Sequence, residues 1–156
     1  MRVGLDGIPL ASPKTGIGHY TFELARALAR TAPTNEFQLI SPVPMTALTK
    51  EDADDLPLNL QVVKAKRKLS WWTLGLPTYG KKNTLALFHG TNYEIPLWSS
   101  FPKVVTIHDL SLLLHADTHP RALARRAKRR LPLMAKAATM IITATESVKQ
   151  IGRAHV

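Results

Sequence analysis

The chain has 156 residues, of which 45% are hydrophobic, and this is enough for one α/β domain with its own core but not for two. It contains no cysteine, which excludes disulfides, thiolate metal ligands and a cysteine nucleophile. No apolar run approaches the roughly 20 residues that cross a bilayer. This composition is typical of the reducing cytosol, so we expect a cytoplasmic protein.

The formal net charge of +10 is concentrated in the second part of the chain. Residues 1–60 carry five basic and seven acidic side chains, whereas residues 61–156 carry sixteen basic and four acidic ones. One short basic stretch falls at residues 64–68. Such a surplus favours an anionic partner, and lipid headgroups, nucleotide phosphates and nucleic acid all fit that description.

The first predicted elements are a buried strand at residues 1–6 and an amphipathic helix. In the helix, Tyr20, Leu24 and Leu28 recur every four residues, which is the spacing of one helical face. The chain therefore begins with a strand that passes through a short loop into a helix, as α/β domains do.

Gly16, Ile17 and Gly18 form the loop between this strand and this helix. A glycine loop at a helix N-terminus favours phosphate, because the backbone N–H groups are accessible and the helix dipole attracts negative charge. The motif is not a full dinucleotide fingerprint, since Thr21 stands where a third glycine is expected, and it is not a Walker loop. A phosphate site and an unliganded turn both fit this loop.

Short apolar runs predict the remaining strands, at residues 36–41, 60–63, 85–88, 103–107 and 140–144. Residues 45–58 form a polar connection whose acidic side chains we expect to be solvated. Residues 69–80 predict a helix that ends near Pro77 and packs its two tryptophans on the sheet. The alternative is that these tryptophans are membrane-interface anchors beside the basic stretch at residues 64–68. Residues 121–138 predict a long basic helix with a kink at Pro132.

The strands are continuous apolar runs, which indicates a parallel sheet covered by helices on both faces. Three of the strands end in polar residues, at positions 6–7, 89–92 and 108–109. Ligands of open α/β sheets bind outside the carboxyl ends of the strands, so we expect these residues to converge on one edge.

Three segments carry a family resemblance by their order and spacing. They are residues 15–28 with Gly-Ile-Gly-His-Tyr-Thr, residues 88–93 with Phe-His-Gly-Thr-Asn-Tyr, and residues 105–111 with Val-Thr-Ile-His-Asp-Leu-Ser. Together with the basic helix, strand and serine-containing helix start at residues 119–147, they resemble the family-four retaining glycosyltransferases of GT-B fold. The resemblance extends to about Lys149.

This resemblance implies an α/β fold, a Rossmann-like three-layer sandwich with a mostly parallel sheet that forms the N-terminal half of a GT-B fold. The implied reaction is transfer of a hexose, with mannose or glucose expected, from a nucleotide diphosphate sugar to a glycan or lipid-linked acceptor, with retention of configuration. The nucleotide sugar is a substrate, and no cofactor is implied.

The resemblance also implies roles for individual residues on the donor side. The backbone N–H groups of Gly16, Ile17 and Gly18 would contact the donor diphosphate from across a cleft, where charge develops as the glycosidic bond breaks. His108 would lie beside the transferred sugar, and Asp109 would orient its ring or cap the next segment. A purely structural role for the His-Asp pair is the alternative.

On the acceptor side, the resemblance implies that His19, His89, Gly90 and Asn92 shape the cleft, although an ordinary turn explains residues 89–92 equally well. We expect no protein-bound metal, because the six histidines are scattered without a helical His-x-x-x-His pair.

In this family the C-terminal domain binds the nucleotide sugar and carries a Glu-x-Glu pair, and the sequence up to Val156 has no such pair. We therefore expect residues 1–156 to be an incomplete acceptor-side domain that lacks the donor-binding domain. We expect this chain alone to be inactive.

Two other classes stay open. An NAD-dependent oxidoreductase has the same kind of fold, but the third glycine is missing here. A non-catalytic basic module would use the 121–130 helix to contact an anionic membrane, and we expect no nucleic-acid partner because no nucleic-acid motif is present. An ordinary solvated helix face is the alternative for that helix.

Overall fold

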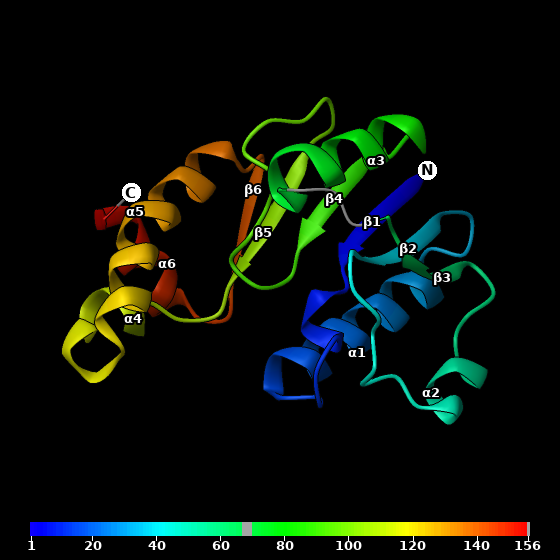
Figure 1. The fold of residues 1–156 in the computed structure, drawn as a ribbon, viewed down its shortest axis with the longest axis horizontal. Coiled ribbons are helices and arrows are strands. Elements are labelled where there is room, and N and C mark those ends of the chain that lie inside the picture. The colour runs from blue at the N-terminus through cyan, green and yellow to red at the C-terminus, as the bar shows by residue number, and fades with distance from the viewer. Residues whose placement is uncertain (67–69, 156) are drawn as a thin grey trace.

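The computed structural model describes residues 1–66 and 70–155, and a six-stranded sheet runs through it (Figure 1). Every neighbouring pair of strands is parallel, in the order β3-β2-β1-β4-β5-β6. The strands are β1 (Arg2–Asp6), β2 (Glu36–Ser41), β3 (Leu60–Lys64), β4 (Leu87–Gly90), β5 (Lys103–Ile107) and β6 (Met140–Thr143). The predicted α/β, Rossmann-like sandwich is confirmed, and its sheet is parallel throughout.

Helices connect the strands and cover the two faces of the sheet (Figure 1). They are α1 (Gly16–Thr31), α2 (Lys50–Asp54), α3 (Leu76–Lys82), α4 (Ser111–Leu114), α5 (Arg121–Ala137) and α6 (Glu146–His155), with short turns η1 (Ile8–Leu10), η2 (Trp71–Gly75) and η3 (Ala116–Thr118). Phe22 of α1 packs with Leu5 in one buried cluster, whereas Leu76 of α3 and Met134 of α5 pack with Phe88 in another. A third and smaller cluster consists of Ile107, Leu110 and Leu131, so the core has two main apolar clusters and one minor one.

The strand order places a switch point between β1 and β4. The chain moves outward from β1 through β2 to β3, returns to the centre at β4, and then moves outward in the other direction. Connections leave the carboxyl ends of β1 and β4 in opposite directions, and ligands of open α/β sheets bind in the resulting crevice.

The buried face of α1 differs from the predicted one by a small rotation. Its buried residues are Gly18, Thr21, Phe22, Ala25 and Ala29, whereas the predicted stripe of Tyr20, Leu24 and Leu28 is only partly buried. One residue corresponds to about 100° around a helix. The rotation turns Tyr20 away from the centre of the core and toward the edge of the sheet that carries the polar strand ends.

The prediction that a helix ends near Pro77 is wrong. The chain forms the π-helical turn η2 and then begins α3 at Leu76, so that Pro77 lies in the first turn of the helix. A first-turn proline costs no hydrogen bond, because that N–H group has no helical partner. The buried Trp71 and half-buried Trp72 pack on the sheet as predicted. Leu69 and part of the predicted basic stretch at 64–68 lie outside the described residues.

The expectation that every strand is covered on both faces is also wrong at the sheet edges. Met140, Ile141 and Ile142 of β6 are 60%, 42% and 37% exposed. At the other edge, Gln61, Val62 and Lys64 of β3 are exposed or half-exposed. Only the four central strands have the two-sided burial that their apolar runs predict.

Candidate functional site

The start of α1 meets the carboxyl ends of β4 and β5. The Tyr20 ring lies edge-on to the His108 ring, with centroids 4.9 Å apart, and its hydroxyl is 3.1 Å from Thr106 Oγ1. One residue later, Thr21 Oγ1 donates to Thr91 Oγ1 at 2.8 Å. Thr91 Oγ1 in turn donates to the carbonyl of Asp6 at the end of β1. The start of α1 and the three predicted strand-end segments, far apart in sequence, therefore belong to one polar cluster.

The prediction that Gly16, Ile17 and Gly18 form a loop is wrong, because they are the first turn of α1; we keep the name glycine loop for these three residues. Its two glycines have different structural roles. A Cβ atom at Gly18 would lie 3.2 Å from the carbonyl oxygen of Pro9, so this glycine allows α1 to approach η1 closely. A Cβ atom at Gly16 would meet nothing within 4 Å, and neither glycine has a positive φ. Packing thus explains why residue 18 is a glycine, whereas neither packing nor backbone conformation gives a reason for glycine at position 16.

The N-terminus of α1 is an open hydrogen-bonding end. Thr15 is the N-cap residue but its side chain makes no cap, and within the described chain the N–H groups of Gly16, Ile17 and Gly18 have no protein acceptor. These donors lie at the positive end of a 16-residue helix. This arrangement suits an anion.

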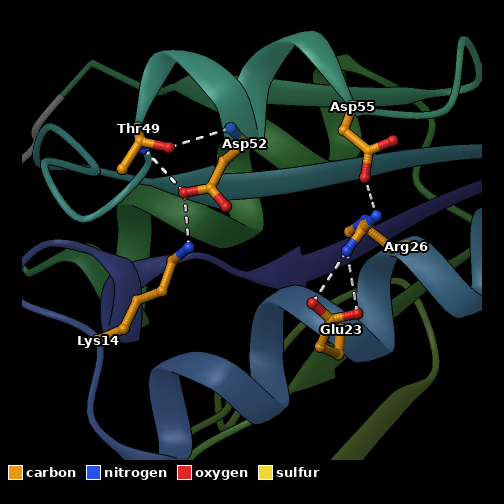
Figure 2. A network of polar contacts seen from close by, with 6 residues as sticks. All are labelled: Lys14, Glu23, Arg26, Thr49, Asp52 and Asp55. Atoms are coloured by element: carbon orange, nitrogen blue, oxygen red, sulfur yellow. Dashed lines mark hydrogen bonds and ion pairs between the residues drawn. The ribbon is translucent and has the colours of Figure 1, made fainter.

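The lysine beside this loop is already engaged. Lys14 Nζ lies 2.6 Å from Asp52 Oδ2, and Asp52 closes a capping box with Thr49 at the start of α2 (Figure 2). The hydrogen bond from Lys14, supported by those from Thr49, lowers the pKa of Asp52 to about 2. An anion at the glycine loop would therefore be held by backbone amides rather than by the Lys14 ammonium.

A second ion-pair group joins α1 to the end of α2. Arg26 bonds both carboxylate oxygens of Glu23 and also Asp55, which directly follows α2 (Figure 2). The prediction that the acidic side chains at residues 45–58 are only solvated is thus partly wrong. Asp52 and Asp55 form ion pairs that join α2 to Lys14 and Arg26. The sequence analysis did not link these carboxylates to the cations Lys14 and Arg26, because the two cations lie on a separate segment of the chain.

His108 is held in a defined orientation. Its Nε2 lies 2.8 Å from the carbonyl oxygen of Thr91, and its ring is flanked by the edges of Tyr20 and Tyr93. A carbonyl oxygen can only accept, so Nε2 carries the proton and donates. In the neutral ring, Nδ1 then carries the lone pair and can accept a hydrogen bond.

Asp109 organises the loop after β5. Its Oδ1 accepts from the N–H and the hydroxyl of Ser111, and its backbone N–H donates to the Tyr93 hydroxyl at 2.9 Å. Partial burial acts to raise the pKa of Asp109, but the two hydrogen bonds from Ser111, together with the smaller effects of Tyr93 and His108, hold this pKa below its ordinary value. Asp109 is exposed and bonds Ser111 at the start of α4, whose N-cap residue is Leu110. Within the described residues it makes no hydrogen bond to the His108 ring.

Tyr93 is in the left-handed backbone region, with a φ of 60°. Such a conformation is costly for a large side chain, and residues under backbone strain are enriched at functional sites. Burial raises the pKa of the Tyr93 hydroxyl to about 12, so this group stays protonated near neutral pH. The sequence carries no signal for this residue beyond its position after a strand end.

His89 and Gly90 lie inside the sheet. The His89 ring is 5% exposed and its Nε2 lies 2.8 Å from Thr106 Oγ1, and burial lowers its pKa to about 4. A Cβ atom at Gly90 would lie 2.0 Å from the carbonyl oxygen of Glu94, so only glycine fits. These two predicted acceptor residues support the site from within and have little or no surface for a ligand.

The other two predicted acceptor residues are accessible. His19 is exposed on α1, and the half-buried Asn92 lines a pocket of about 280 Å³ together with Asp109. Asn92 and Asp109 are thus brought together, whereas His19 is not one of the residues that line this pocket.

One buried carboxyl group of the cluster was not predicted as a site residue. Asp6, at the end of β1, is 2% exposed, and its Oδ1 accepts from the Ile8 N–H at 3.0 Å. Burial raises the pKa of Asp6 to about 7, against the lowering effect of that hydrogen bond, and the Glu94 carboxylate raises it further. The signal for Asp6 in the sequence was its position at the carboxyl end of a buried strand.

The described residues contain no cluster of three or more His, Cys, Asp or Glu side chains suited to a metal ion. Across the same part of the chain, no helix combines the length and apolarity that a membrane crossing requires. No protein-family model matches the chain, and no curated protein matches it.

Proposed function

We propose that this chain is the acceptor-side portion of a retaining hexosyltransferase that uses a nucleotide diphosphate sugar. The glycine loop would receive the diphosphate, and His108 would contact the transferred sugar through Nδ1. Asn92 and the pocket beside it would receive the acceptor. Mannose and glucose are the proposed sugars, and a glycan or a lipid-linked molecule is the proposed acceptor.

Gly16 is the observation that carries this proposal. Packing and backbone conformation leave this position free, yet it is a glycine at the first residue of an uncapped helix. A ligand that must approach the backbone N–H groups closely supplies the missing reason. Because Tyr20 of the same helix contacts His108 and Thr21 contacts Thr91, whose carbonyl bonds the His108 ring, a diphosphate at the loop would lie on the side of the fold that carries His108.

The direct test is binding of nucleotide diphosphate sugars to the ¹⁵N-labelled chain. UDP-glucose and GDP-mannose are titrated separately, and amide signals of Gly16, Ile17 and Gly18 are expected to shift. The Gly16→Ala variant should bind at least several-fold more weakly, because its methyl group occupies the approach to the N–H groups. Its thermal stability should be unchanged or higher, since alanine fits this backbone and restricts the unfolded chain.

Gly18→Ala is the comparison variant, and it should lower the melting temperature because its methyl group is forced against the Pro9 carbonyl. Equal binding by wild type and Gly16→Ala would remove the phosphate role of the loop. Tight binding of NADH with no response to either nucleotide sugar would favour an oxidoreductase instead. The chain alone is expected to bind without catalysing transfer.

A specific observation supports a second proposal, contact with an anionic membrane surface through α5. Arg121, Arg125, Lys128, Arg129 and Lys136 are exposed on this helix, and within the described residues none of them makes an ion pair. Their spacing places them on one side of α5, opposite the residues that line the pocket.

A further inference from the structure

The pocket of about 280 Å³ lies between α4, α5 and the segment that follows β4. One end carries Asn92 and Asp109, the residues placed at the site above. Most of the wall is apolar and comes from Leu110, Leu112, Leu113, Leu123, Leu131 and Met134. Its volume is close to the lower end of the range for small-molecule sites in proteins.

The walls of this pocket are tied together by bonds across it. Glu94 Oε1 accepts from Arg126 at 3.0 Å and from Arg130 at 3.1 Å, and Glu94 Oε2 lies 2.5 Å from Arg130. Below this cluster, the Ile95 N–H contacts Met134 Sδ at 3.5 Å. The segment after β4 is thereby held against α5, so the pocket exists without a ligand.

The side chains that line the pocket carry equal numbers of positive and negative charges. Two guanidinium groups, Arg126 and Arg130, face the carboxylate of Glu94, and Asp109 adds one further negative charge at the polar end. The Arg126 and Arg130 side chains are committed to Glu94, and Asp109 Oδ1 is committed to Ser111. No charge is left over deep in the pocket to select an ion, and a sugar ring would lose hydrogen bonds to water there without replacement.

We infer that this pocket takes the apolar part of an acceptor, an alkyl, prenyl or aryl group attached to the hydroxyl-bearing part that lies at Asn92 and Asp109. This inference rests on the proposed function in naming the ligand an acceptor, and among the proposed acceptors it selects those with an apolar group. Leu123 of the lining is 46% exposed, and Leu114, which follows the lining residue Leu113, is 44% exposed, so apolar surface extends beyond the pocket.

The test is a chain-length series of n-alkyl β-D-glucosides, each titrated below its micelle concentration into the wild-type chain without a nucleotide sugar. Each buried methylene adds apolar contact, so the octyl compound is expected to bind at least roughly tenfold more tightly than the butyl compound. Equal affinities of the two compounds would overturn the inference.

Matched variants on α5 locate the binding. Ala127→Phe places a ring in the pocket and should reduce octyl glucoside affinity at least tenfold, whereas Ala122→Phe, on the exposed side of the same helix, should not. Leu123→Gln and Leu133→Gln form a milder pair, because the two leucines are 46% and 49% exposed and only Leu123 lines the pocket. Equal losses from both members of a pair would overturn the inference, and circular dichroism verifies folding.

These outcomes are separable from those for the proposed function. Chain-length dependence together with equal nucleotide-sugar binding by wild type and Gly16→Ala would keep the pocket and remove the phosphate role on which the glycosyltransferase proposal rests. Nucleotide-sugar binding at Gly16 without chain-length dependence would do the reverse.

Discussion

Burial shifts the pKa values of two titratable side chains near the centre of the sheet in opposite directions. Burial lowers the pKa of His89 from 6.5 to about 4 and raises the pKa of Asp6 from 3.8 to about 7. His89 is neutral in the fold, so its contribution to stability is lost as the pH falls from 6.5 to 4, where the unfolded chain takes up a proton. Asp6 binds its proton more tightly in the fold, so its contribution is lost as the pH rises from 3.8 to 7. The two effects overlap and largely cancel.

Single substitutions should therefore expose opposite pH dependences. Relative to wild type, His89→Gln should gain stability as the pH is lowered from 7 to 4.5, and Asp6→Asn should lose it, each with a slope of up to about 1.4 kcal/mol per pH unit. Urea unfolding at several pH values measures both slopes. His19→Gln, on the exposed surface of α1, is the control. Slopes of the same sign in the two variants would contradict the opposed burial effects.

For individual residues, the sequence predicted which side chains gather at the carboxyl edge of the sheet but not the contacts that each one makes. The strand predicted at 85–88 is observed at Leu87–Gly90. This shift of two residues moves His89 from the loop after the strand into the strand itself, where it is buried. The difference between Gly16 and Gly18 depends on the Pro9 carbonyl, a contact that forms only when η1 packs on α1.

The two sides of helix α5 differ in character. One side lines the pocket, and the other carries Arg121, Arg125, Lys128, Arg129 and Lys136 without ion-pair partners in the described structure. The contribution of such a face to membrane binding is about 1 kcal/mol per basic residue near an anionic surface, and it weakens as salt screens the charges.

The chain should therefore bind vesicles that contain phosphatidylglycerol but not vesicles of phosphatidylcholine alone. Flotation or sedimentation with vesicles measures this, and added salt should release the protein. The double variant Lys128→Glu/Arg129→Glu should reduce binding at least tenfold, while Lys81→Glu/Lys82→Glu on α3 should reduce it much less, because the net charge change is the same but the location differs. Equal reduction by both variants would show that total charge alone is responsible, and salt-sensitive binding to duplex DNA without vesicle binding would point to nucleic acid.

Among the elements, strands and long helices were predictable because their apolar spacing depends on local sequence. The bounds of β5 are those predicted, and α5 ends one residue earlier than expected, continuing through Pro132. The rotation of α1 was not predictable from its spacing, because Thr21 and Gly18 are buried by contacts with Thr91 and Pro9 rather than by their own apolarity. That rotation places Tyr20 against His108.

The two edges of the whole sheet differ in how they are protected. The outer strand β3 carries Lys64, and a charged side chain on an edge strand discourages pairing with another molecule. The outer strand β6 has no charge and exposes Met140, Ile141 and Ile142. Edge strands of this kind associate with other chains.

We therefore expect concentration-dependent self-association of this chain, and Ile141→Lys should suppress it. Val62→Lys is the matched control, since Val62 and Ile141 are each 42% exposed but lie at opposite edges of the sheet. Sedimentation velocity over a range of concentrations measures the effect. Suppression by Val62→Lys alone would locate the contact at β3 and contradict the argument from β6.

The close contact at Gly90 bears on how this chain tolerates sequence change. Any side chain at position 90 must push the Glu94 carbonyl away, and Glu94 also holds Arg126 and Arg130 of α5. Selection for a working protein would keep glycine there whatever ligand is used, because the constraint is imposed by the backbone. At Gly16 the fold imposes no such constraint, so any preference for glycine at that position reports on the ligand alone.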